Sequence, residues 1–471
     1  MIKKILIANR GEIAVRIIRA CAEMGIRSVG IYTEADRYAL HVKRADESYS
    51  LGEDPIEGYL NPQKIVSLAK EVGCDAVHPG YGFLSENAEF ARLCEEQGVQ
   101  FIGPHSSVIH RMGDKTQARD TMRSAGVPVT PGSDGNLRDL DDAIEVAAGI
   151  GYPVMLKATS GGGGRGIRRC DSEEELRTQY PRVISEATKA FGSAEVFLEK
   201  CIVNPKHIEV QILADRKGNV VHLYERDCSI QRRNQKLIEI APSPQLTPDQ
   251  RRYIGGLAVK AAEAVGYENA GTVEFLLTGN EVYFMEMNTR VQVEHTISEQ
   301  ITGVDIVREQ INIASGKALK YRQEDIKYRG YALQFRINAE DPKNDFLPSF
   351  GRVSHYYAPG GPGVRVDTAI YTGYDIPPYF DSMCLKLIVW ALDWDEVIQR
   401  GQRALEDMRL HGIKTTAAYY QEILANPDFM SGEFNTSFVL EHPELLKYSE
   451  KKHPSEMALA IATAVAAHAG W

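Results

Sequence analysis

The feature that most constrains how this chain can fold is residues 284–295 (FMEMNTRVQVEH), where polar side chains recur at every second position. Successive side chains of an extended strand point to opposite faces of a sheet. One face of this predicted strand is apolar and carries Met285, Met287, Val291 and Val293. The other face carries Glu286, Asn288, Arg290, Gln292 and Glu294. A core strand does not need five such groups, so the pattern predicts a binding or catalytic face.

A second predicted strand, residues 272–277, precedes the first and is joined to it through Gly279 and Asn280, a strong turn signal. If Thr278 pairs with Val282, Glu274 lies directly opposite Glu286. Facing carboxylates repel each other unless a cation lies between them. Magnesium prefers hard oxygen ligands and bridges protein to phosphate oxygens, so the pair predicts a magnesium site. The alternative is a solvated strand face with a chance pair of acids, which the mixed array disfavours.

Composition excludes several classes of protein. The 471 residues suffice for two or three domains, and a net charge of −10 without a basic block disfavours a nucleic-acid partner. Seven cysteines scattered singly favour reduced thiols in a cytoplasmic protein over a disulfide or zinc framework. No apolar run approaches the length of a membrane span, and the chain opens directly into a strand, so we expect neither a membrane segment nor a signal peptide.

The first hundred residues alternate short apolar runs with helical patterns, which predicts a parallel, Rossmann-like sheet. The predicted elements are residues 5–8, 12–24, 29–32, 63–72, 76–77, 86–97 and 101–103. A GxGxxG fingerprint is missing and Arg10 replaces a needed glycine, so dinucleotide binding is disfavoured. The glycine-rich loop 78–86 follows a strand, where ligands often bind, but a tight strand-to-helix turn explains it equally well.

The middle of the chain carries candidate phosphate-binding groups. Asp114 is a predicted helix cap, and Lys115 follows it. A strand ending at Lys157 leads into SGGGGRG, residues 160–166, which predicts a flexible lid over phosphates more strongly than a surface linker. Residues 207–213 alternate as a strand, in which His207 is most simply an ordinary strand histidine. The basic run 228–236 is either an anion-facing loop or a solvated turn.

The last third predicts a helix over residues 298–315, then a mostly β unit from Tyr331. In that unit Gln334, Arg336 and Asn338 share a face. Residues 394–410 and 415–426 have helical patterns. Residues 454–468 form an alanine-rich, almost wholly apolar helix that must be buried against this protein or a partner.

Seven long motifs resemble those of biotin carboxylases, members of the ATP-grasp superfamily, and the likeness extends from the first strand to about Tyr448. They are IANRGEIAVRIIRA, HPGYGFLSEN, MGDK, KATSGGGGRGI, ERDCSIQRR, EMNTRVQVEH and RINAEDP. Within that family the chain is most similar to the separate biotin carboxylase subunit of two-subunit pyruvate carboxylases. The segments QRRNQKLIEIAPSP and EHTISEQITG and the alanine-rich tail carry that finer likeness.

The resemblance implies an α/β ATP-grasp fold with an N-terminal Rossmann-like domain and a C-terminal mostly β biotin carboxylase domain. The implied boundaries are 1–113 for the first domain, 114–330 for the ATP-grasp domain with a lid at about 131–203, and 331–448 for the third. Residues 449–471 form a helical tail, which we expect to dock on a partner.

The resemblance also implies the site residues. The ATP-binding positions are Lys115, Lys157, Gly162, Gly163, Gly164, Gly166, Glu199, Ile202, His207, Gln231, Asn234 and Lys236. The metal ligands are Glu274, Glu286 and Asn288, and the bicarbonate and biotin contacts are Arg290, Gln292, Val293, Arg336 and Tyr81. The implied catalytic groups are Arg290, Lys236, Glu294 as the base and Arg336 as the stabiliser of the biotin enolate. Asn234, Ile240 and Thr296 depart from common family residues.

The implied function is ATP- and bicarbonate-dependent carboxylation of biotin through carboxyphosphate, with Mg²⁺, or Mn²⁺ as its alternative. No AMKM-like biotinylation turn occurs in the chain, so biotin is expected on a carrier and carboxyltransferase subunit, with this chain a homodimer inside a hetero-oligomer. The implied acceptor is pyruvate, with 2-oxoglutarate and acyl-CoA as alternatives. Other possibilities are an ATP-grasp carboxylate–amine ligase, a silent nucleotide-binding scaffold and, last, a dehydrogenase.

Overall fold

A computed structural model describes residues 2–159, 166–448 and 454–469. The N-terminal part is a five-stranded parallel sheet with strand order β3-β2-β1-β4-β5, which confirms the predicted Rossmann-like start. Its strands are β1 (Lys4–Ile7), β2 (Arg27–Tyr32), β3 (Glu47–Ser50), β4 (Ala76–His78) and β5 (Gln100–Phe101). Its helices are α1 (Gly11–Glu23), α2 (Leu40–Arg44), α3 (Pro62–Glu71) and α4 (Ala88–Glu96). Ile5 and Ile7 pack on α1, whereas Leu6 packs on α3 and α4, as strand alternation requires.

The next part contains α5 (Ser106–Gly113), α6 (Lys115–Ser124), α7 (Leu140–Ile150), α8 (Glu173–Phe191) and a small antiparallel sheet. The sheet order is β7-β6-β8, with β6 (Val154–Ala158), β7 (Ile167–Cys170) and β8 (Val196–Lys200). Asp114 is the N-cap of α6 and accepts hydrogen bonds from the backbone N–H groups of Thr116 and Gln117, which confirms that prediction. The glycines Gly162, Gly163 and Gly164 of the predicted lid lie outside the described residues.

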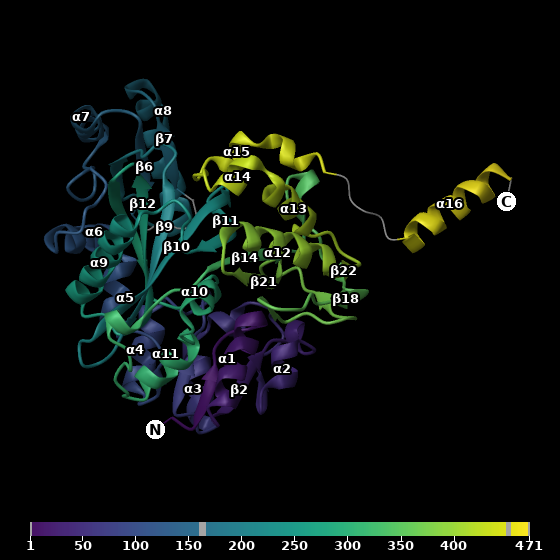
Figure 1. Ribbon diagram of the computed structural model, residues 1–471. Helices are drawn as coiled ribbons and strands as arrows, with labels where there is room; N and C mark the ends of the chain where they lie inside the picture. Colours follow the sequence, from purple (N-terminus) through teal and green to yellow (C-terminus); the bar gives the residue numbers. More distant parts are fainter. Residues whose placement is uncertain (1, 160–165, 449–453, 470–471) are drawn as a thin grey trace.

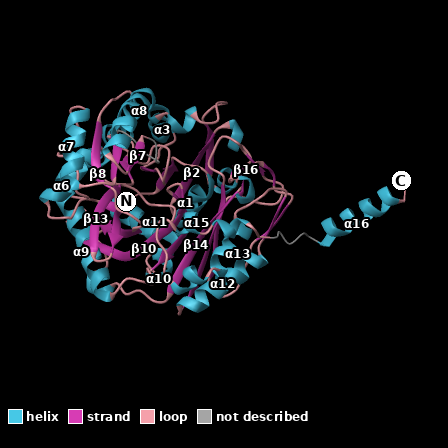
Figure 2. Ribbon diagram, turned by 90° about the horizontal axis from the view of Figure 1, so that it is seen from above, coloured by secondary structure: helices cyan, strands magenta, loops and turns pink. Residues whose placement is uncertain are grey.

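An eight-stranded antiparallel sheet forms the centre of the molecule (Figure 1), in the order β13-β12-β9-β10-β11-β14-β21-β19. Its strands are β9 (Lys206–Ala214), β10 (Val220–Arg232), β11 (Gln235–Ala241), β12 (Asn269–Thr278), β13 (Glu281–Asn288), β14 (Tyr331–Asn338), β19 (Val364–Thr368) and β21 (Met383–Ala391). The pairing of β11 with β14 joins the strands β9 to β13 to those of the C-terminal part. Seen from above in Figure 2, helices such as α9 (Pro248–Val265) and α12 (Trp394–Asp407) lie outside the strands.

The C-terminal part combines short strands with helices, as predicted for residues 394–410 and 415–426. The helices are α12, α13 (Ala417–Ala425), α14 (Pro427–Ser431) and α15 (Phe438–Glu441). The short strands are β15 (Glu340–Asp341), β16 (Leu347–Pro348), β17 (Gly351–Arg352), β18 (His355–Tyr357), β20 (Asp375–Ile376) and β22 (Arg409–His411). The predicted helix 394–410 was too long, because α12 ends at Asp407 and β22 follows it.

The hairpin of β12 and β13 confirms that Glu274 pairs with Glu286, by a different register from the predicted one. Thr278 pairs with Glu281, so the turn contains only Gly279 and Asn280. A bulge between Glu274 and Phe275 in the ladder compensates for the shorter turn. The expected strand across residues 284–295 was wrong beyond Asn288, because residues 289–294 form a loop that leads into α10 (His295–Thr302).

Two other predictions are corrected. The single helix over residues 298–315 is two helices, α10 and α11 (Ile306–Ala314), because Gly303 ends α10 with φ +72° and Asp305 caps α11. The run 228–236 is neither a loop nor a solvated turn. It belongs to the hairpin of β10 and β11, in which only the tip at Arg233 and Asn234 is a turn.

The apolar tail forms a helix as predicted, α16 (Pro454–His468), and Figure 1 shows it apart from the rest of the molecule. Leu459, Ile461 and Val465 are each at least 60% exposed. Across the described ranges, the structure holds no helix with the length and apolarity needed to cross a membrane.

Candidate active site

Four neighbouring strands of the large sheet carry charged side chains at positions that pair across the sheet. Glu274 on β12 pairs with Glu286 on β13 and with Glu209 on β9, and Glu209 in turn pairs with Arg226 on β10. Directly paired residues of an antiparallel sheet share a face. Three carboxylates and one guanidinium therefore lie side by side across β13, β12, β9 and β10.

Lys236 on β11 holds these acids together. Its ammonium lies 2.5 Å from Glu209, 3.0 Å from Glu274 and 2.8 Å from Glu294. Burial lowers the pKa of Lys236, but the three carboxylates outweigh it and raise that pKa well above its usual range. Burial likewise raises the pKa of Glu274, and the Lys236 and His207 side chains overcome this and hold it well below the usual range. Both groups are therefore charged at neutral pH.

Glu286 differs from its neighbours. Within the described part of the chain no hydrogen bond or ion pair reaches its carboxylate, whereas Glu274 accepts hydrogen bonds from Asn288 at 2.9 Å and Gln292 at 2.7 Å. Burial first, and then the Glu274 carboxylate, raise the pKa of Glu286, which Lys115 lowers in part. A half-buried acid that faces another acid and has no hydrogen-bond partner among the described residues fits a divalent cation. Glu274, Glu286 and the amide oxygen of Asn288 are suitable ligands for such a cation.

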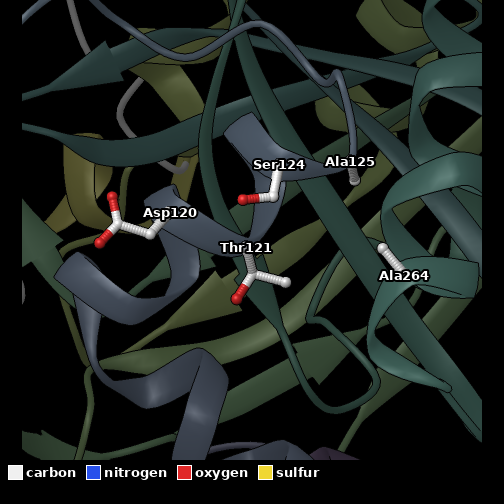
Figure 3. A pocket seen from close by; sticks show the side chains of 5 residues that line it. All are labelled: Asp120, Thr121, Ser124, Ala125 and Ala264. Carbon is white, nitrogen blue, oxygen red and sulfur yellow. The ribbon is translucent and has the colours of Figure 1, made fainter.

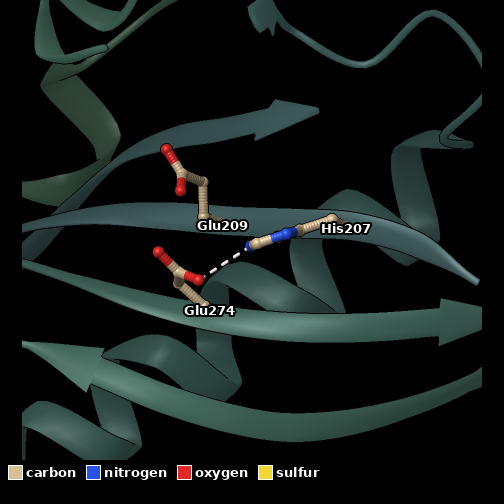
Figure 4. Close-up of side chains that lie close together, drawn as sticks. All are labelled: His207, Glu209 and Glu274. Carbon is tan, nitrogen blue, oxygen red and sulfur yellow. Dashed lines mark hydrogen bonds and ion pairs between the residues drawn. The ribbon is translucent and has the colours of Figure 1, made fainter. Parts of the chain in front are cut away.

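Figure 4 shows His207 and Glu274 in contact, with Glu209 beside them. Ligand atoms of these three residues lie within 4.8 Å of one another, so they too form a metal-sized group. The His207 ring nitrogen Nε2 is 2.8 Å from Glu274. His207 is therefore a buried, hydrogen-bonded strand histidine, as the simplest expectation has it, and its partner is Glu274, one acid of the predicted metal pair.

Arg336 on β14 and Glu294 in the loop after β13 form the second half of the site. Arg336 donates to Glu294 at 3.0 Å and to the buried Glu239 at 2.5 Å. Burial raises the pKa of Glu294, and the Lys236 and Arg336 cations reverse the effect and bring it far below the usual range. Glu239 thus anchors one side of the guanidinium while Arg336 and Lys236 together hold Glu294.

Arg290 and Gln292 occupy the same loop. Arg290 donates to Glu86 at 2.8 Å and to the Asn288 side-chain oxygen at 3.0 Å. Gln292 accepts from Arg226 at 2.8 Å while it donates to Glu274. Glu86 belongs to the glycine-rich loop 78–86, so this contact favours the ligand-edge interpretation over a mere tight turn. Tyr81, from the same loop, donates its hydroxyl to Glu12.

The expected nucleotide positions are only partly brought together. The Glu199 carboxylate is bound by Lys157 and by Arg119, the latter at 2.5 Å. Burial lowers the pKa of Lys115, and the nearby Glu286 carboxylate offsets this only in part. Gln231 donates to the Cys228 carbonyl at 3.2 Å beside His207, and Ile202 is half-buried. Gly166 has φ +69° just before β7, and Asn234 is exposed at the β10–β11 tip.

Sequence reasoning overlooked four residues that organise the site: Glu209, Arg226, Glu239 and Glu86. Two carried a readable signal. Glu209 alternates with His207 and Gln211 on one face of an otherwise apolar strand, and Arg226 lies in the ERDCSIQRR motif. Arg226 is completely buried and donates to Gln211, Thr272 and Gln292, with a further close contact to Glu209. Glu239 and Glu86 lie far along the chain from their arginine partners, which only the fold brings together.

A depression of about 480 Å³ lies between α6 and α9, lined by Asp120, Thr121, Ser124, Ala125 and Ala264 (Figure 3). None of these residues belongs to the charged cluster, and the depression is therefore not part of the candidate active site.

Comparison with known proteins places this geometry in a family. Residues 1–109 match the biotin carboxylase N-terminal domain, residues 114–322 the carbamoyl-phosphate synthase L chain ATP-binding domain, and residues 334–441 the biotin carboxylase C-terminal domain.

Three relatives match nearly the whole chain. The 2-oxoglutarate carboxylase small subunit of Hydrogenobacter thermophilus is 55% identical over all of both chains. Biotin carboxylase 1 of Bacillus subtilis is 54% identical over 93% of this chain and 98% of its own length. A pyruvate carboxylase subunit of Methanothermobacter thermautotrophicus is 52% identical over 94% of this chain and 90% of its own.

Two solved structures agree closely with the fold. The biotin carboxylase domain dimer of the Hydrogenobacter thermophilus 2-oxoglutarate carboxylase, in complex with MgADP, ADP and bicarbonate, superposes with a TM-score of 0.93 at 56% identity, over 96% of this chain and 100% of that one. The biotin carboxylase subunit of a pyruvate carboxylase gives 0.84 at 57% identity with the same coverage. The three matched domains, the full-length relatives and the shared fold together show that this chain belongs to the biotin carboxylase family.

Proposed function

We propose that the chain is the biotin carboxylase subunit of a two-subunit 2-oxo acid carboxylase, with pyruvate as the final acceptor. The observation that carries the chemistry is the pairing of Glu274 with Glu286 next to the Lys236–Glu294–Arg336 chain. One part of this arrangement suits a nucleotide-bound metal ion, and the other suits a small anion and its proton.

The proposed roles follow from the charges. Magnesium, when bound between the two acids, would neutralise them and the phosphate oxygens of ATP. Lys236, Arg290 and the Gln292 amide would orient bicarbonate for in-line attack on the γ-phosphate, with Glu294 taking its proton, to give carboxyphosphate. Val293 and Tyr81 would complete the bicarbonate and biotin site.

Carboxyphosphate then breaks to carbon dioxide and phosphate, and the phosphate removes the ureido proton of biotin. An enolate formed there needs a fixed cation aimed at it. Arg336 meets this requirement, because Glu239 and Glu294 hold its guanidinium from two sides.

Two likenesses support pyruvate as the acceptor. One sequence relative is a pyruvate carboxylase subunit, and one similar solved structure is the biotin carboxylase subunit of a pyruvate carboxylase. The full-length match to the 2-oxoglutarate carboxylase small subunit supports 2-oxoglutarate as the second candidate. Because a relative's biotin carboxylase domain crystallised as a dimer, we propose a homodimer within the complex.

The tail supports a separate partner. Helix α16 lies beyond all three matched domains, and its Leu459, Ile461 and Val465 side chains are exposed. A helix that is apolar all round is stable in water only when it is buried. We therefore propose that α16 docks on the carrier and carboxyltransferase subunit.

The test has two stages. ADP formation by the isolated chain should require bicarbonate and increase with free biotin, whereas a carboxylate–amine ligase would show neither response. The chain reconstituted with its biotinylated partner should then form product from pyruvate in preference to 2-oxoglutarate and acyl-CoA. Preference for 2-oxoglutarate would replace pyruvate as the acceptor without changing the first conclusion.

A further inference from the structure

Lys386, in the middle of β21, is a completely buried lysine that the proposed chemistry does not use. Its cross-strand neighbours are Arg336 on β14 and Asp367 on β19. Paired residues share a face, so Lys386 lies directly beside the guanidinium of the active site. A buried ammonium is costly unless it is compensated. Glu12 of α1 supplies the opposite charge at 3.0 Å.

Lys386 also makes a hydrogen bond that charge balance does not require. Its ammonium donates to the backbone carbonyl of Val293 at 3.0 Å. Val293 lies between Gln292 and Glu294 in the loop 289–294, which belongs to no helix or strand. Because a peptide unit is planar, a fixed Val293 carbonyl also fixes the orientation of the peptide bond that leads into Glu294. The direction of the Glu294 side chain toward Lys236 and Arg336 depends on that orientation.

The same ammonium is connected to Tyr81. The Tyr81 hydroxyl donates to the Glu12 oxygen that Lys386 contacts, and the Lys386 ammonium lies 5.8 Å from the centre of the Tyr81 ring. The other Glu12 oxygen is buried and accepts no hydrogen bond from the described residues. Lys386 thus joins a loop of the N-terminal sheet, the loop before α10 and the C-terminal strands at one point.

We propose that Lys386 is a positioning residue for the bicarbonate step, which aligns Glu294 through the Val293 carbonyl and Tyr81 through Glu12 without touching the substrate. The inference rests on biotin carboxylase activity and is independent of the acceptor and the partner. The competing explanation is that Lys386 only neutralises Glu12.

Two variants of the full chain separate these explanations. E12Q removes the acid but keeps the hydrogen bond from Lys386 to Val293. K386M/E12Q removes both charges and that hydrogen bond. The matched control is R251M/E225Q, which removes a partly buried ion pair outside the site, with its charged atoms 2.7 Å apart. Each variant is assayed with free biotin while ATP and bicarbonate are varied separately, and ADP affinity and Tm are measured.

We expect K386M/E12Q to lower kcat/KM for bicarbonate by roughly 10- to 100-fold, the effect of a small misplacement of catalytic groups. The KM of K386M/E12Q for ATP and its affinity for ADP should stay within about twofold of wild type. The contacts that bind the nucleotide are unchanged in this variant. E12Q should lose less than about threefold in kcat/KM for bicarbonate, because the glutamine amide oxygen still accepts from Tyr81 and Lys386 still donates to Val293. R251M/E225Q should behave as wild type.

A charge-balancing role predicts the reverse order, because E12Q alone leaves the Lys386 cation without its nearest acid. The proposal is overturned if E12Q is as impaired as K386M/E12Q, or if the ATP and bicarbonate parameters fall together. If K386M/E12Q does not fold, K386R is compared with E12Q instead. The planar guanidinium of K386R keeps the positive charge but cannot occupy the position of the ammonium. Absence of bicarbonate-dependent activity in the wild type would instead contradict the proposed function, before any variant is compared.

Discussion

Of the four clustered acids Glu209, Glu274, Glu286 and Glu294, only Glu286 makes no direct polar contact within the described residues. Glu209, Glu274 and Glu294 share Lys236, and Arg226 and Arg336 supply further positive charge. The protein therefore neutralises three of its four clustered acids and leaves the fourth to its ligand. An unpartnered acid of this kind should weaken the metal-free fold, and a bound cation should reverse that effect.

Substitution of Glu286 tests this argument through pH. Its pKa is raised in the fold by burial and by Glu274. A raised acid pKa means that the folded state binds its proton more tightly, so stability falls as the pH rises from the unfolded pKa through the folded one. In EDTA, E286Q should therefore be more stable than wild type by about 1 kcal/mol at pH 8 and no different at low pH.

The measurement is Tm against pH, with E281Q on the same strand as the control, since Glu281 is exposed. E286Q should also lose ATP-dependent activity by at least about 100-fold, because Glu286 is a proposed ligand of the metal ion. A lower Tm for E286Q at pH 8 would contradict the unpartnered-acid argument.

Arg336 allows stability and catalysis to be separated. R336M leaves Glu239 buried without its cation, which should cost roughly 3–5 kcal/mol in the free energy of unfolding. R336M/E239Q removes the stranded charge and should recover most of that stability. Neither variant should carboxylate free biotin at more than about 1% of the wild-type rate, because the stabilising cation is absent from both.

Urea unfolding and the free-biotin assay provide the two measurements. If R336M/E239Q recovered activity together with stability, Arg336 would be a structural residue and not part of the reaction.

At the scale of elements, local patterns predicted the strands and helices well, but not where they end. Alternation correctly placed Glu274 opposite Glu286, although the turn length and the bulge were not anticipated. The pattern over residues 298–315 is helical throughout, and only the left-handed Gly303 and the Asp305 cap divide it. Glycine tolerates both helical and left-handed backbone, so composition alone could not distinguish a helical glycine from a helix end.

Alanine at two glycines makes this distinction measurable. Gly303 has φ +72° with open space around its Cβ position, so G303A should lose about 1 kcal/mol of stability from backbone strain alone. Gly256 is exposed inside α9 with equally open surroundings, so G256A should gain about 0.5–1 kcal/mol. Urea unfolding of both variants gives the two free energies. Equal effects of the same sign would show that backbone conformation does not decide the outcome.

At the scale of the molecule, the sequence predicts three successive units but not that two of them share a sheet. The pairing of Ile238 with Phe335 joins β11 to β14, and neither strand carries a local signal for its partner. Long-range pairing depends on complementary faces formed only in the folded chain. This is why Arg336 could be identified from its motif, while its neighbours Glu239 and Lys386 could not.

The tail gives the prediction that concerns the whole assembly. Leu459, Ile461 and Val465 are 69%, 60% and 62% exposed, so they contribute little burial to the fold of the isolated chain. L459Q/I461Q/V465Q keeps good helix formers but removes the apolar surface. We expect its Tm and its free-biotin activity to equal those of wild type, while co-purification with the biotinylated subunit is lost.

T463A/H468A is the matched control, since it alters two exposed polar residues of the same helix and should retain the partner. Two outcomes would contradict partner docking. Undiminished co-purification of the triple variant would show that the partner binds elsewhere. A lower Tm or a changed oligomeric state of the isolated triple variant would show that α16 packs on this chain or on a second copy of it.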